Sequence, residues 1–254
     1  MTQWYFWGDK QFADVYENIY IRTFVEDWFK IVLEIAKEIK GKLLLDVGCG
    51  EGHTTKQILD RIGDNIVCDL LEPNKVALTS AQNFLSFENN VGNVYVGTLS
   101  SFNPAKKYDT VFTSHTNYYW ATDEKDYQKQ LMKLTSLLKD KGRLLILTLP
   151  KNSDHYNIML KKVYPDFVFS EYVADFYKKK GFSIKVEKCK MRMFVGDMLT
   201  NKHFFDLNNF YRFIHNVNDY PNKNESQTFL EKIKRFQKDS YLDFKDELII
   251  VEKI

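Results

Sequence analysis

Short apolar runs alternate along this chain with longer stretches in which apolar residues recur every three or four positions. Each short run is bounded by glycine, proline or polar residues, which is typical of buried β-strands. The runs predict strands at 43–47, 65–71, 93–97, 108–114, 143–149, 182–188 and 247–252. Together they account for a seven-stranded sheet.

The stretches before the first strand and between the later strands have helical spacing. The first of them, at 14–39, has apolar side chains at Val15, Ile19, Phe24, Trp28, Ile31, Val32, Ile35 and Ile39. Gly41 follows, as glycine often does at the end of a helix. Further helices are predicted at 54–62, 75–87, 126–138, 170–180, 204–215 and 226–238.

Strands that alternate with helices predict an α/β protein with crossover connections and a mostly parallel sheet. We therefore expect a Rossmann-like, doubly wound fold over residues 41–254. Residues 1–40 are expected to form an N-terminal helical cap, which either closes over a ligand as a lid or only covers one sheet edge. Residues 190–246 are expected to form a helical insertion before the last strand.

Composition narrows the class of protein. With 254 residues, 44% hydrophobic and 28% charged, the chain resembles a soluble globular domain. Its formal net charge of +2 gives no strong attraction to nucleic acid, and no apolar run is long enough for a membrane span. Cys49, Cys68 and Cys189 are far apart, so neither a disulfide framework nor a zinc site is expected. The aromatic and charged residues 1–14 do not resemble a signal peptide, so a cytoplasmic protein is expected.

The clearest chemical signal is the segment 46–52, Asp-Val-Gly-Cys-Gly-Glu-Gly, between the first strand and the next helix. Glycines allow a sharp turn and a close approach of a ligand to the backbone. Glu72 ends the second strand, 20 residues after Gly52, where a carboxylate can accept hydrogen bonds from both hydroxyls of a ribose. Together these features predict a nucleoside-binding α/β domain.

The glycine spacing distinguishes between nucleosides. A dinucleotide site has the pattern Gly-x-Gly-x-x-Gly, whereas this chain has Asp-x-Gly-x-Gly-x-Gly and so resembles the class I S-adenosylmethionine-dependent methyltransferases. The resemblance covers residues 42–187 and the last strand, and it implies S-adenosyl-L-methionine as cofactor. The cofactor-binding residues that it implies are Asp46, Gly48, Cys49, Gly50, Glu72, Pro73, Thr98, Leu99, Ser100 and Ser114.

A second cluster of functional side chains follows the fourth strand, at 114–120. His115 is a candidate to bind the methyl acceptor or to remove its proton, or it is only a capping residue. Tyr118 is the second catalytic candidate and Tyr119 a substrate-binding candidate. With Trp120 they are able to form an aromatic wall for a cationic amine, or they are ordinary core residues.

A closer resemblance is to the histamine N-methyltransferase group. It is based on the Tyr118-Tyr119 pair, the long helical insertion and the N-terminal aromatic residues. This resemblance implies Trp7, Tyr16 and Glu17 as further substrate-binding residues, with Glu26 an alternative acidic candidate. The group has glutamine near the position of His115, so the chain departs from it there.

These features predict methyl transfer from S-adenosyl-L-methionine to a small molecule, most simply to a nitrogen of an amine or imidazole compound. The reaction requires no metal, and the histidines show no metal-ligand spacing. Alternatives are methylation of an oxygen, or of RNA or protein, although the net charge does not favour a nucleic-acid partner. A protein that binds the nucleoside without catalysis is the last alternative, and the intact glycine motif argues against it.

Overall fold

The computed structural model describes residues 25–121, 123–154, 156–160, 166–196, 198–199, 204–215 and 219–253. The chain divides into two compact units. The sheet unit comprises 30–149, 165–188 and 247–254, and the insertion unit comprises 1–29, 150–164 and 189–246. Trp7, Tyr16 and Glu17, and with them most of the predicted cap, lie outside the described residues, and the side chain of Glu26 is not described either.

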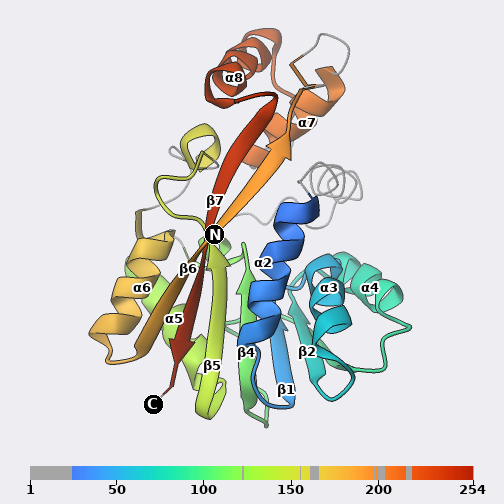
Figure 1. Ribbon diagram of the computed structural model, residues 1–254, viewed down its shortest axis with the longest axis vertical. Helices are drawn as coiled ribbons and strands as arrows, with labels where there is room; N and C mark the ends of the chain where they lie inside the picture. The colour runs from blue at the N-terminus through green and yellow to red at the C-terminus, as the bar shows by residue number, and fades with distance from the viewer. Residues whose placement is uncertain are drawn as a thin grey trace. The chain divides into compact units, whose positions relative to one another are not determined.

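A seven-stranded sheet has the order β3-β2-β1-β4-β5-β7-β6, as Figure 1 shows in part. The pairs from β3 to β5 are parallel, and β7 is antiparallel to β5. The predicted α/β, mostly parallel fold is thereby confirmed. The strands are β1 (Leu43–Val47), β2 (Val67–Glu72), β3 (Val91–Val96), β4 (Tyr108–Ser114), β5 (Leu138–Thr148), β6 (Ser183–Phe194) and β7 (Tyr241–Glu252).

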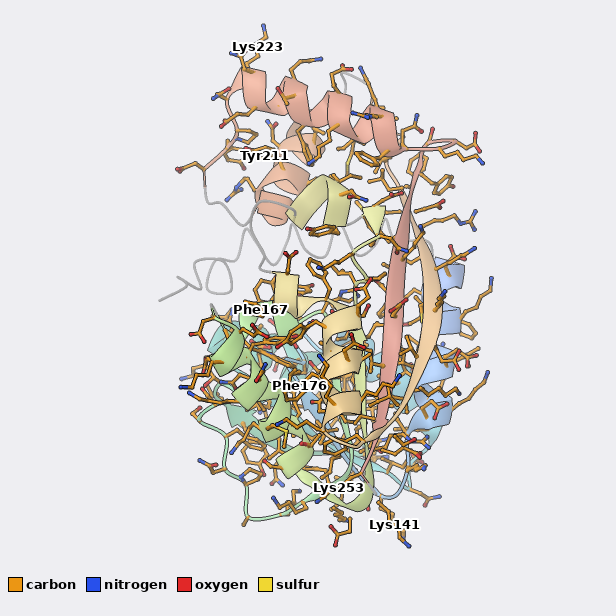
Figure 2. The ribbon with its side chains drawn as sticks, turned by 90° about the vertical axis from the view of Figure 1, so that its left-hand side faces the viewer. Lys141, Phe167, Phe176, Tyr211, Lys223 and Lys253 are labelled. Atoms are coloured by element: carbon orange, nitrogen blue, oxygen red, sulfur yellow. The ribbon has the colours of Figure 1, made fainter. Side chains whose placement is uncertain are left out.

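Helices cover both faces of the sheet, with α2 and α5 on opposite sides (Figures 1 and 2). Several helices begin at side chains that accept backbone N–H groups of the first turn: Asn74 caps α4, Asp123 caps α5, and Asn222 forms a capping box with Glu225 at α8. The α-helices are α2 (Val25–Glu38), α3 (His53–Ile62), α4 (Lys75–Phe84), α5 (Glu124–Ser136), α6 (Ser170–Lys179), α7 (Phe204–His215) and α8 (Lys223–Phe236). Short turns of helix are η1 (Asn117–Tyr119), η2 (Tyr156–Leu160) and η3 (Asp166–Val168).

The last two strands are longer than the sequence predicted. The predicted strand at 182–188 continues to Phe194 in β6, and the predicted strand at 247–252 begins at Tyr241 in β7. In these added segments buried residues alternate with exposed ones, which is strand periodicity over a stretch with weak apolar character. The helices predicted at 204–215 and 226–238 correspond to α7 and α8. Among the described residues, no helix is sufficiently long and apolar to cross a membrane.

The strand order determines where a ligand binds. β1 is flanked by β2 on one side and β4 on the other, so the chain order reverses between β1 and β4. In open α/β sheets, ligands bind beyond the carboxyl ends of the strands at such a reversal. The described candidate residues of the sequence analysis lie at the carboxyl ends of β1, β2, β3 and β4 or in the loops that follow them.

Candidate functional site

The loop after β1, which we call the glycine turn (residues 48–52), requires its glycines. Gly48, Gly50 and Gly52 have φ values of 78°, 55° and 84°, a left-handed region that side chains disfavour. Gly48 N donates a 2.7 Å hydrogen bond to Leu71 O, and a Cβ atom at Gly48 would overlap the side chain of Thr116. A Cβ atom at Gly50 would meet nothing within 4 Å, so the turn borders open space at this point.

Asp46 lies in β1, two residues before Gly48, and is buried. Thr55 Oγ1, from the first turn of α3, donates a 2.6 Å hydrogen bond to Asp46 Oδ2. Burial raises the pKa of Asp46 to about 7; the bond from Thr55 opposes this shift and the nearby Glu72 adds to it. Asp46 therefore fastens the start of α3 to the end of β1, and it exchanges its proton near neutral pH.

Glu72 is the last residue of β2 and is also buried. Its Oε2 accepts a 3.1 Å hydrogen bond from Gly50 N, and its Oε1 accepts a 2.9 Å bond from Asn74 N. Burial raises the pKa of Glu72, while these two bonds favour the ionised form. A carboxylate has about four acceptor positions, so each oxygen keeps one for a further donor such as a sugar hydroxyl.

The remaining predicted cofactor residues lie at the ends of the neighbouring strands. Gly97 N, just after β3, donates a 3.1 Å bond to Glu72 O, which joins the β3 loop to the β2 end. In that loop Thr98 Oγ1 and Ser100 Oγ are 2.9 Å apart, and Leu99 is buried. Pro73 is exposed, Cys49 is buried in the glycine turn, and Ser114 ends β4.

The loop after β4, which we call the aromatic loop (residues 115–120), contains the catalytic candidates. His115 adopts a φ of 53°, an uncommon value for a residue other than glycine, and its N–H donates a 2.9 Å bond to Leu147 O. The His115 and Tyr118 ring centroids are 6.5 Å apart, and Tyr118 meets Tyr119 edge to face at 4.6 Å. The structure thus groups the three candidates in one half-buried cluster.

Asn117 fixes the aromatic loop and was not among the predicted residues. It is buried, and its Nδ2 donates to the Tyr127 hydroxyl at 2.9 Å and to Val168 O at 2.6 Å. Its Oδ1 accepts a 2.7 Å bond from Thr148 Oγ1. Phe167 packs on the Tyr127 ring at 5.4 Å, and it is labelled in Figure 2. One side chain therefore ties the aromatic loop to β5, α5 and η3.

Two further residues of the site were missed, Thr55 and Asn74. Asn74 had a visible signal, since an asparagine after Pro73 and before a helix is a typical N-cap. Thr55 had no such signal, because its partner Asp46 lies in a different element. Asn117 had none either, because its partner Thr148 is far away in the sequence. Among the described residues, no group of three His, Cys, Asp or Glu side chains is arranged to bind a metal ion. All three cysteines are buried, and none of them forms a disulfide.

Part of the chain is similar to known methyltransferases. Residues 45–144, from β1 into β5, match a protein-family model described as a methyltransferase domain. A tRNA U34 carboxymethyltransferase from Ruthia magnifica subsp. Calyptogena magnifica is 33% identical over 124 residues, which cover 48% of this chain and 37% of that protein. A malonyl-acyl-carrier-protein O-methyltransferase 2 from Ilyobacter polytropus is 26% identical over 157 residues, which cover 61% of this chain and 57% of that protein. The matches thus span less than two thirds of either relative.

Solved structures resemble the fold over nearly the whole chain. The YcgJ protein from Bacillus subtilis superposes with a TM-score of 0.59 at 16% identity, covering 89% of this chain and 97% of that one. The N-methyltransferase NodS from Bradyrhizobium japonicum WM9, in complex with S-adenosyl-L-homocysteine, gives a TM-score of 0.56 at 10% identity and covers 90% and 86%. At these identities the likeness concerns the fold, which this chain shares with methyltransferases.

Proposed function

Because residues 45–144 match a methyltransferase domain, we propose that this chain transfers a methyl group from S-adenosyl-L-methionine to a nitrogen of a small amine or imidazole compound. The observation on which the proposal rests is the Glu72 carboxylate, held beside Gly50 N at the point where β1 and β2 end. It joins a ribose-binding acid to a glycine turn in a single hydrogen-bonded unit.

The residues present fit this cofactor. Glu72 keeps one acceptor position on each oxygen, which suits the two neighbouring hydroxyls of a ribose. The open space beside Gly50 admits a ligand against the backbone, where a side chain would obstruct it. The ionised form of Glu72, which its two hydrogen bonds favour, attracts a positive charge nearby, and this suits a sulfonium.

The aromatic loop supplies the acceptor side of the proposal. The cofactor provides an electrophilic methyl carbon on a sulfonium, which leaves as a neutral thioether. The acceptor nitrogen forms its bond to that carbon as the carbon–sulfur bond breaks, and the bonding pair goes to sulfur. We assign to His115 the removal of the proton from the amine, and to Tyr118 and Tyr119 the positioning of the acceptor. The Tyr118-Tyr119 pair and the helical insertion, which resemble the histamine N-methyltransferase group, support this choice.

A second candidate acceptor is suggested by the relatives. One is named as acting on tRNA and another on an acyl-carrier protein, so the same domain type serves acceptors attached to macromolecules. The formal net charge of +2 does not favour an RNA partner. We therefore place the small molecule first.

The experiment has two stages. Calorimetric titration of the full chain with S-adenosyl-L-homocysteine is expected to show one site per chain, whereas binding of a dinucleotide instead would contradict the cofactor assignment. The chain is then incubated with S-adenosyl-L-methionine and a panel of amines, imidazoles, phenols, carboxylic acids, tRNA and acyl-carrier protein, and products are detected by mass spectrometry. Methylated amines or imidazoles support the proposal. Methylation confined to phenols or acids moves the reaction to oxygen, and methylation confined to tRNA or carrier protein selects the second candidate.

A further inference from the structure

The insertion unit contains a buried cation for which the described residues supply no counter-ion. Arg212 of α7 is 4% exposed, and its guanidinium carbon is 4.5 Å from the centre of the Tyr220 ring. Its Nη1 lies 3.5 Å from Asn209 Oδ1, one helical turn earlier. Its Nε is buried and has no hydrogen-bond partner, and no Asp or Glu in the described part of the chain forms an ion pair with this arginine.

Its surroundings make this arrangement costly. Arg212 shares α7 with the buried residues Leu207 and Phe210, and Phe210 packs on Phe229 of α8 at 5.7 Å. Figure 2 shows Tyr211 on α7, below the helix α8 that begins at Lys223. An arginine stays charged at any ordinary pH, and a buried charge without a partner is strongly unfavourable.

The nitrogen atoms of this cluster that form no hydrogen bond in the described structure are donors. Arg212 Nε is a donor, and the Asn209 side chain, itself 7% exposed, forms no hydrogen bond in the described structure through its own donor, Nδ2. The Tyr220 ring lies over the guanidinium in a cation–π contact, and with 51% exposure it brings the cluster to the surface. A buried guanidinium nitrogen without an acceptor suits an oxyanion, which arginine binds through two parallel N–H groups.

We propose that Arg212, Asn209 and Tyr220 form a binding site for the carboxylate or phosphate group of a ligand. The bound oxyanion supplies the counter-charge and the acceptors that the described residues lack. The inference goes beyond methyl transfer and does not depend on it, because all three residues belong to the insertion unit.

The test uses thermal unfolding and calorimetry of the full chain in sodium chloride, sodium phosphate or sodium succinate at equal ionic strength. Phosphate or succinate is expected to raise the melting temperature, because a ligand that binds only the folded state stabilises it. The Arg212→Met variant is expected to melt no lower than the unmodified chain in chloride, since it removes an unpaired buried charge. It is also expected to bind the oxyanion at least about tenfold more weakly. The control is Arg235→Gln, which removes an exposed arginine from α8 and should change neither measurement.

A second variant tests the proposal even if Arg212→Met does not fold. Asn209→Asp places a carboxylate about where the amide now approaches Arg212, and it should raise the melting temperature in chloride and abolish the response to added oxyanion. The stronger of the phosphate and succinate responses assigns the ligand group. The proposal is overturned if neither anion stabilises the unmodified chain, or if Arg212→Met lowers the melting temperature in chloride while oxyanion binding persists.

Discussion

The glycine turn and the aromatic loop follow neighbouring strands of one sheet, β1 and β4, but they are held in place by different means. The glycine turn owes its shape mainly to the backbone: three glycines have positive φ, and Gly48 N donates a hydrogen bond to Leu71 O in β2. One bond to a side chain, from Gly50 N to the Glu72 carboxylate, is added to these. The aromatic loop depends on the side chain of Asn117, which reaches three other elements. The two loops touch where Gly48 approaches Thr116.

This difference suggests how the proposed function is divided. A loop built from backbone and glycine allows little variation, which suits the part that binds an unchanging cofactor. A loop whose anchor is one buried side chain leaves its other residues half-buried and replaceable, as an acceptor site requires. The following predictions test this division, beginning with the largest expected effect.

The first concerns the buried acid of the glycine-turn region. The folded protein keeps the proton of Asp46 up to about pH 7, whereas the unfolded chain loses it near pH 3.8. Between these values the folded state binds more protons, so the free energy of unfolding falls as pH rises, by about 4 kcal/mol in total for this group. Asp46→Asn should remove this contribution. Urea unfolding at several pH values between 4 and 8 measures it, with Asp60→Asn as the control for an exposed acid of the same region.

The second concerns the anchor of the aromatic loop. Asn117→Ala leaves the Tyr127 hydroxyl, Val168 O and the Thr148 hydroxyl without their partner, and it should destabilise the protein by about 3 kcal/mol. Turnover should fall while the affinity for S-adenosyl-L-homocysteine changes less than about twofold in the folded fraction. Denaturant unfolding measures the loss of stability, and calorimetry measures the affinity for S-adenosyl-L-homocysteine. The exposed Asn83→Ala variant is the control. A parallel loss of cofactor affinity would show that the two loops are not independent.

The third removes the ribose-binding acid of the proposal. Glu72→Ala should weaken S-adenosyl-L-homocysteine binding about 100-fold, since two hydrogen bonds to a charged acceptor are lost, and the fold should remain intact. Calorimetry measures the affinity, and circular dichroism checks the fold. Glu88→Ala, which removes an acid paired with Lys56 away from the turn, should bind normally. Unchanged affinity in the Glu72 variant would contradict the assignment of Glu72 as the acid that binds the ribose.

The fourth has the smallest expected effect and tests the acceptor side. His115→Ala should lower turnover by at least about tenfold, and cofactor affinity should stay the same because the glycine turn is untouched. Single-turnover methyl transfer, compared with calorimetry of the same sample, distinguishes these quantities. Full activity of this variant on the true acceptor would exclude His115 from the chemistry.

The strand and helix pattern was largely readable from the sequence because it depends on local periodicity. The run Leu43-Leu44-Leu45 and the helix that follows the glycine turn illustrate this. The ends of β6 and β7 were not readable in the same way. Their outer halves alternate buried residues such as Met191 and Met193 with exposed ones, and this pattern becomes clear only once the strands are known to pair.

The sequence by itself determined the glycine turn and the acid that ends β2, because both depend on backbone conformation and on spacing along the chain. Only the tertiary structure revealed how Asp46 meets Thr55 and how Asn117 joins Tyr127 to Thr148. It also revealed that Arg212 is buried with no acid paired to it in the part of the chain that the structure describes. These contacts join elements distant in sequence or depend on burial. Hydrogen bonds and desolvation costs are set by neighbours in space, and no spacing along a single chain encodes them.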